Sequence, residues 1–162
     1  MSTPLSTIAK QLLDRRNHTK KFPRLLANER PDSIDQALAI QGQMSVETTA
    51  KIGGWKCLLP LDDEKVIVAP IYSNTIWQEG EATFHPDNNN ARVEPEIAFI
   101  LSKALPAKSS DYTEEEIDQA IGTTHMALEL IQSRFDTNVP EDEAPNFYEL
   151  LADGLSNQGL YI

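Results

Sequence analysis

Hydrophobic residues near the start of the chain recur at helical spacing. Leu5, Ile8, Leu12 and Leu13 fall on one side of a helix, which predicts a helix over residues 5–17. The segment that follows is basic, polar and punctuated by proline, as is typical of a loop. The first apolar stripe of the chain therefore belongs to an amphipathic helix that needs a partner to cover it.

A second helix is predicted after this loop. Asp32 or Ser33 can cap it, and Ser33 with Gln36 has the spacing of a capping box. Helical periodicity then continues toward the pair Gly53-Gly54, which we expect to end the helix, because glycine commonly follows the last helical turn.

Beyond Gly54 the pattern changes to short apolar runs that are typical of strands, separated by glycine, asparagine and proline. The expected strands cover residues 55–59, 65–71, 81–85, 92–101 and 125–135. Another helix is expected over residues 114–121 and a helical turn over 147–151. The last residues, 159–162, are expected to enter one more strand.

A run of three glutamates stands at the start of the expected helix over residues 114–121. Thr113 and Glu116 have capping-box spacing, and the helix dipole favours negative charge in the first turn. A helix start is the simpler interpretation of this run, and an acidic docking site is the alternative.

The order of these elements indicates the α+β class. The chain has 162 residues, which suits one domain with a substantial core. We expect a single domain over residues 1–162, with a helical part over 1–53 and a β-rich part over 54–162.

Composition excludes several classes of protein. The net charge of −11 disfavours a nucleic-acid partner. No apolar stretch approaches the roughly 20 residues of a membrane helix, no secretory signal is evident, and Cys57 cannot form an internal disulfide, so we expect a cytoplasmic protein without a membrane segment. Glycine-rich nucleotide motifs are absent. One cysteine and three scattered histidines offer no zinc-ligand spacing; these histidines are His18, His85 and His125.

Two glutamates head the strand expected over residues 92–101. Because side chains alternate along a strand, Glu94 and Glu96 share one face with Ala98 and Ile100. The other face is apolar and is expected to meet the core; it holds Val93, Ile97, Phe99 and Leu101. Two neighbouring carboxylates repel each other, so they require solvent, basic partners or a bridging cation.

Glu129 interrupts the apolar run His125–Ile131 of another expected strand. A buried carboxylate needs an arginine, a lysine, a proton or a metal ion. Arg134 is close in sequence but points to the other face if alternation continues, whereas His125 shares the face of Glu129 and is interpreted as a core or rim histidine. A structural ion pair and a metal site both remain open for Glu129.

Lys56 lies inside the apolar run that follows Gly54. Its side chain can extend to the surface, as is usual for lysine. Alternatively, it is partly desolvated and binds an anionic substrate or moves protons.

Three blocks of sequence carry a resemblance to a known family. GWK at 54–56, VEPEIAF at 93–99 and ALELIQSRF at 127–135 resemble, in order and spacing, the 2-keto-4-pentenoate hydratase and 4-oxalocrotonate decarboxylase branch of the fumarylacetoacetate hydrolase-like superfamily. The resemblance spans nearly the whole chain and implies a truncated form of that family's mixed β-sandwich roll.

The resemblance also implies a site. Glu94, Glu96 and Glu129 would bind Mg²⁺ or Mn²⁺, and Lys56 would assist proton transfer. The ion would chelate the carboxylate and the 2-oxo oxygen of a short 2-oxo or 2-hydroxydienoic acid from aromatic catabolism. Such a ligand set suits hydration and decarboxylation equally.

The sequence also departs from the family, whose members are longer. Residues 57–60 replace a glycine-containing turn, and Ile71 stands where hydratases often carry an aspartate. Three hypotheses follow: a metal-dependent lyase, a non-catalytic relative that keeps the fold, and an interaction module without metal. Because a terminal strand would leave an unpaired edge, we expect a homo-oligomer or a complementing chain.

Overall fold

The computed structural model describes residues 3–58, 66–87 and 89–162. The helices are α1 (Leu5–Arg15), α2 (Ile34–Glu47), α3 (Glu114–Asp118) and α4 (Phe147–Ala152), with short 3-10 turns at Ser73–Thr75 and Glu141–Glu143. The strands are β1 (Ile52–Cys57), β2 (Val68–Tyr72), β3 (Ile76–Trp77), β4 (Arg92–Leu101), β5 (Ile121–Ile131) and β6 (Asn157–Tyr161). Helices and a mixed sheet in one chain confirm the α+β class.

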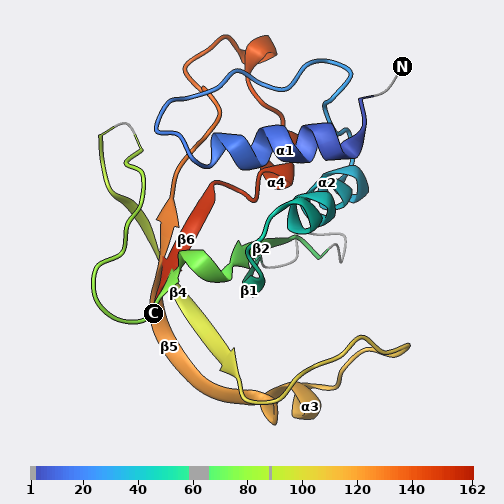
Figure 1. Cartoon of the computed structure of the whole chain (residues 1–162). Coiled ribbons are helices and arrows are strands. Elements are labelled where there is room, and N and C mark those ends of the chain that lie inside the picture. Colours follow the sequence, from blue (N-terminus) through green and yellow to red (C-terminus); the bar gives the residue numbers. More distant parts are fainter. Residues whose placement is uncertain (1–2, 59–65, 88) are drawn as a thin grey trace.

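Three helices form a layer beside the strands, and the core lies mainly among them. Figure 1 shows α1, α2 and α4 gathered on one side of the molecule, with β6 and β2 running beneath them. Leu12, Ile40 and Leu151, one from each helix, are almost fully buried in the same cluster. Burying these apolar faces against one another is the main force that holds a helical layer together.

The strands form two sheets. β1 and β2 make an antiparallel pair, and the second sheet has the order β3-β6-β5-β4. β3 and β6 are parallel, whereas the other neighbours in that sheet are antiparallel. The terminal strand β6 therefore lies between two partners, and the expectation that it forms an open edge is wrong. Within the described residues the edge strand of this sheet beside β5 is β4.

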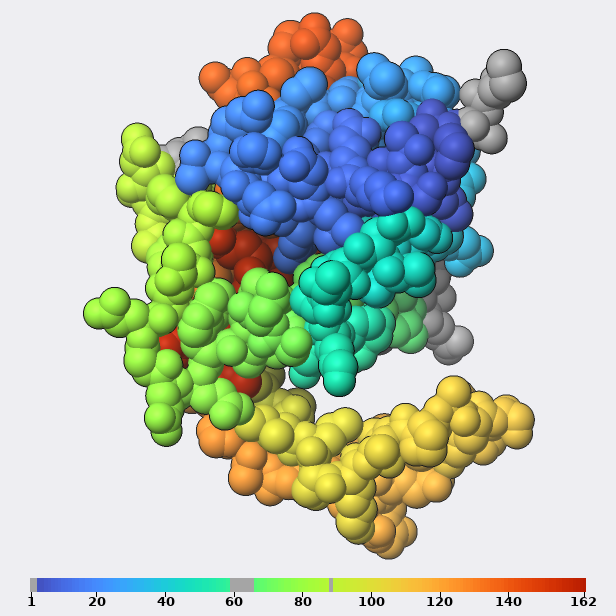
Figure 2. Space-filling model, viewed as in Figure 1, coloured from blue at the N-terminus to red at the C-terminus, as the bar shows by residue number. Residues whose placement is uncertain are grey.

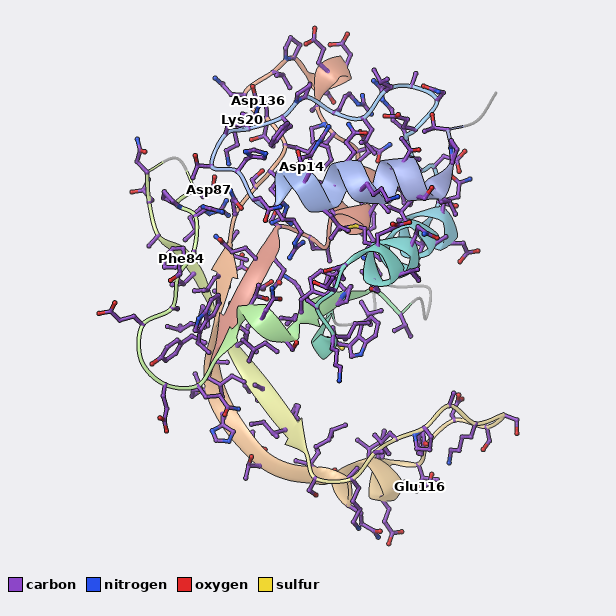
Figure 3. The ribbon with its side chains drawn as sticks, viewed as in Figure 1. Asp14, Lys20, Phe84, Asp87, Glu116 and Asp136 are labelled. Carbon is purple, nitrogen blue, oxygen red and sulfur yellow. The ribbon has the colours of Figure 1, made fainter. Side chains whose placement is uncertain are left out.

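Capping signals in the sequence predicted where helices begin. Ser33 caps α2 by accepting a hydrogen bond from the Gln36 N–H, as expected, but the Gln36 side chain accepts from Asp32 rather than from Ser33. The capping box of Thr113 and Glu116 at the start of α3 is complete. The helix-start interpretation of the three glutamates thus accounts for their positions. Figure 3 labels Glu116 on α3, which lies between β4 and β5 in the chain.

The prediction that Gly53-Gly54 ends α2 is wrong. α2 ends at Glu47, where Thr48 turns to an extended conformation, and both glycines lie within β1. A Cβ atom on Gly53 would lie 2.8 Å from the Cα of Ser73. Gly53 therefore allows β1 to approach the turn after β2 closely.

The predicted strand over residues 81–85 is also absent from the described structure. At its last residue, the Gln158 side chain accepts a hydrogen bond from His85 N and donates one to His85 O. The backbone of His85 is thus paired with an amide side chain instead of a neighbouring strand. The predicted strand over 125–135 is shifted, since β5 runs from Ile121 to Ile131.

The apolar face of β4 is exposed, which corrects the expectation that it meets the core. Ile97 is 63% exposed and Phe99 58%, and Met126, opposite Ile97 on β5, is 73% exposed. The reason is topological: the core lies among the helices, whereas β4 and β5 extend together away from it. Figure 2 shows this hairpin as an arm that stands clear of the remaining molecule.

No helix among the described residues combines the length and the apolar character needed to cross a bilayer.

Candidate metal centre

Three glutamates from two neighbouring strands meet on one face of the larger sheet. Glu94 of β4 lies directly opposite Glu129 of β5, and Glu96 follows two residues along β4. Side chains at opposed positions, and at every second position of a strand, share a face. One carboxylate oxygen from each of the three glutamates lies within 4.8 Å of the others.

This spacing fits a single divalent cation. Mg²⁺–oxygen bonds are about 2.0–2.1 Å long and Ca²⁺–oxygen bonds about 2.3–2.6 Å, so ligand atoms on opposite sides of one ion lie roughly 4–5 Å apart. Hard cations of this kind prefer carboxylate oxygens. The donor set and its span therefore suit such an ion, although the role of these residues as ligands stays a prediction.

Lys56 of β1 reaches the same cluster. Its Nζ donates to Glu129 Oε2 at 2.7 Å and lies 3.8 Å from Glu94 Oε2. The Lys56 side chain keeps 16% of its surface exposed, whereas Glu129 is 2% exposed. Glu129 thus has the basic partner that a buried carboxylate requires. Three carboxylates around one ammonium still leave an excess of negative charge that a cation would neutralise.

Asn157, the first residue of β6, approaches Glu129 from the other side. Its Nδ2 donates to Glu129 Oε1 at 2.8 Å, and its side chain is completely buried. The two oxygens of Glu129 therefore have different partners: Oε1 accepts from the Asn157 amide, and Oε2 accepts from Lys56. Sequence reasoning missed Asn157, which lies two residues before the strand expected over residues 159–162.

Other residues considered from the sequence lie away from the cluster. Arg134 is fully buried, and its Nε pairs with Asp153 Oδ2 at 2.7 Å, so it does not serve Glu129. His125 is exposed on β5, where its Nε2 lies 2.9 Å from Thr123 Oγ1. Position 71 is occupied by an isoleucine, which is buried in β2 and has no carboxylate to offer. The turn at residues 57–60 lies partly outside the described residues.

Two solved structures match this arrangement of elements over almost its whole length. Both are of 4-oxalocrotonate decarboxylase from Pseudomonas putida G7, one complexed with magnesium and adipate and the other with calcium and acetate. The TM-scores are 0.70 and 0.68, at 17% sequence identity, and each match covers 99% of this chain.

The chain has the fumarylacetoacetate hydrolase-like fold. The resemblance inferred from the three sequence blocks is confirmed by this match. The chain spans 64% and 63% of the two decarboxylase chains, so somewhat more than a third of each has no counterpart in it. No protein-family model and no curated protein sequence matches the chain.

Proposed function

We propose that the protein is a divalent-metal-dependent lyase that acts on short 2-oxo or 2-hydroxydienoic acids. The observation that supports this proposal is the cluster itself: three carboxylates on one sheet face, with a lysine in contact. Glu94, Glu96 and Glu129 would hold Mg²⁺ or Mn²⁺. The relatives in the comparison were solved with magnesium or calcium.

The residues of the chain divide the chemistry between them. A divalent ion held by the three glutamates would supply Lewis-acid polarisation of the substrate's 2-oxo group. Glu129 is held in place for that task by hydrogen bonds from Lys56 and Asn157. The Lys56 side chain keeps 16% of its surface exposed, and its ammonium has donors beyond the one given to Glu129. It can therefore hold the substrate carboxylate and pass a proton to or from the carbon chain.

Hydration and decarboxylation both fit this set of residues, because both need an electron sink at the 2-oxo end of the substrate. The absence of a carboxylate at Ile71 favours decarboxylation, which requires no group to activate water. A second candidate is a non-catalytic relative that binds metal or a 2-oxo acid. It is favoured by the ion pair of Lys56 with Glu129, which gives this lysine a structural partner.

Metal binding is the first test. Chelator-treated protein is titrated with MgCl₂ and MnCl₂ by calorimetry, and its melting temperature is measured with each ion. We expect saturable binding of one ion and a higher melting temperature, with both effects lost in Glu96→Gln. The matched control is Glu115→Gln, which removes an exposed carboxylate from α3 and should change neither. Unchanged melting curves with both ions would contradict a metal-dependent function.

Turnover separates the two candidate functions. The Mg²⁺-loaded protein is incubated with 2-hydroxypenta-2,4-dienoate, to detect hydration, and with 4-oxalocrotonate, to detect release of CO₂. Turnover of either substrate that disappears in Lys56→Met supports the lyase. Metal binding without turnover of either substrate supports the non-catalytic relative.

We also propose that the protein works as an oligomer. The proposal is supported by the exposed apolar face of β4 and β5, since apolar patches of this kind commonly mark interaction surfaces. A two-stranded hairpin alone is marginally stable in water, so covering this face would also stabilise the arm.

A further inference from the structure

We propose that Asn157 determines which divalent ion the centre prefers, by allowing Glu129 to offer one oxygen only. This inference rests on the proposed metal site and names a residue outside the predicted ligands. Its basis is the geometry around the Glu129 carboxylate. Asn157 Nδ2 donates to Oε1 at 2.8 Å, whereas Oε2 lies on the side of Lys56, whose Nζ is 2.7 Å from Oε2 and 3.8 Å from Glu94 Oε2.

The orientation of the Asn157 amide follows from charge. If the amide were reversed, its Oδ1 would face a Glu129 carboxyl oxygen, and two acceptors would repel. With Nδ2 in that place, the amide donates to Glu129 Oε1 and more weakly, at 3.4 Å, to Gly159 O. Oδ1 is buried and has no hydrogen-bond partner within the described structure. The orientation of the amide thus leaves Oδ1 without a partner among the described residues and keeps the hydrogen bond from Nδ2 to Glu129.

The backbone of Asn157 is held firmly enough for this task. Its carbonyl oxygen accepts hydrogen bonds from Arg16 Nη2 and Arg134 Nη1, both at 3.0 Å. The turn that delivers it contains Gly154, Leu155 and Ser156, all with positive φ. Left-handed backbone is costly for leucine and serine and persists only where the surroundings enforce it. Asn157 is therefore placed by a strained turn, by the buried Arg134 and by the partly buried Arg16.

Restricting Glu129 to one oxygen has a consequence for selectivity. Mg²⁺ requires near-octahedral geometry at short distances, and a bidentate carboxylate fits that geometry poorly. Ca²⁺ accepts six to eight oxygens and often takes carboxylates bidentately. Because Asn157 occupies Oε1, Glu129 is a one-oxygen ligand and the centre favours Mg²⁺ over Ca²⁺.

The test compares affinities for MgCl₂ and CaCl₂ by calorimetry on the chelator-treated full chain. In Asn157→Leu, which keeps the size and loses the donor, we expect Mg²⁺ affinity to fall about 10- to 100-fold, the usual effect of losing a residue that orients a ligand. Ca²⁺ affinity should stay or rise, so the ratio of the two affinities falls at least tenfold. Asn157→Asp, which also removes the donor, should lower the ratio in the same direction and serves if the leucine variant does not fold.

A matched control is Gln132→Met. Gln132 is a buried amide whose oxygen has no hydrogen-bond partner among the described residues, and its Nε2 donates to His18 O. It should lose stability without changing the ratio of affinities.

If the Asn157 variants leave the ratio of Mg²⁺ to Ca²⁺ affinity unchanged, the proposal is overturned. Asn157 would then be a structural residue, even where both affinities fall. Wild-type protein that binds neither ion would overturn the proposal together with the metal site. If the protein binds metal but shows no turnover, the lyase function is overturned. The ratio of Mg²⁺ to Ca²⁺ affinity then still decides the role of Asn157.

Discussion

Glu94 lies directly opposite Glu129 across the antiparallel pair of β4 and β5. In water-covered strands such a pairing of like charges destabilises a sheet. Here Glu129 is buried and Glu94 half-exposed, and Lys56 stands between them. We therefore interpret the pairing of Glu94 with Glu129 as a site for cations. This interpretation leads to predictions about the glutamates and about Lys56.

Glu129→Gln should abolish stabilisation by metal. At a Mg²⁺ concentration of one hundred times Kd, binding adds about 2.7 kcal/mol, which for a domain of this size raises Tm by about 5–10 °C. A neutral amide is a weaker ligand than a carboxylate, so we expect most of this rise to disappear. Scanning calorimetry with and without MgCl₂ measures it, and a full rise in the variant would remove Glu129 from the ligand set.

Lys56→Met should destabilise the metal-free protein and increase its response to metal. The substitution leaves the buried Glu129 without its ammonium partner, and the free energy of unfolding should fall by about 2–3 kcal/mol at neutral pH. Because Mg²⁺ then supplies the missing positive charge, the rise in Tm on adding metal should exceed that of the wild type. Paired melts of both proteins test this. A smaller rise in the variant would show that the lysine assists metal binding.

Asp87 lies outside the glutamate cluster and pairs with Arg92, the first residue of β4. This ion pair predicts that the stability of the protein depends on pH. Figure 3 shows Asp87 in the loop that leads into β4. Its carboxylate pairs with Lys21 and, at 2.6 Å, with Arg92. Burial raises the pKa of Asp87, but hydrogen bonds from Lys21 and Arg92 outweigh it and hold the pKa below its ordinary value.

A lowered pKa in the folded state means that Asp87 stabilises the protein above the pKa it has when unfolded, about 3.9. This contribution is lost as pH falls through the folded pKa. Asp87→Asn should therefore lower the free energy of unfolding by about 2 kcal/mol at pH 7, and the difference should shrink below about pH 4. Urea unfolding across this pH range is the measurement. A difference that stays constant with pH would contradict the ionic role of Asp87.

The apolar face of the arm should cause self-association. Ile97 on β4 and Met126 on β5 face each other and are both largely exposed. Ile97→Glu should lower the average mass in concentrated solution, because a charge on this face opposes burial. Gln119→Glu adds the same charge at an exposed site beyond α3 and should have no such effect. Light scattering compares them, and equal masses for all three proteins would exclude this face.

Local rules in the sequence determined several features of the protein. The start of α2 followed from its cap, the extent of β4 followed from its apolar run, and alternation placed Glu94 and Glu96 on one face. These features depend on neighbours a few residues apart, so a short stretch of chain contains the information. The resemblance of three sequence blocks then suggested that Glu129 would join them.

Only the tertiary structure decided what surrounds those glutamates. The contacts of Lys56 and Asn157 with Glu129 join β1 and β6 to β5, and no local pattern encodes such distances. The same holds for burial: alternation correctly separated the two faces of β4, yet it could not show that Ile97 and Phe99 lie outside the core. Periodicity describes which side chains share a face, whereas the packing of distant segments decides whether that face is covered.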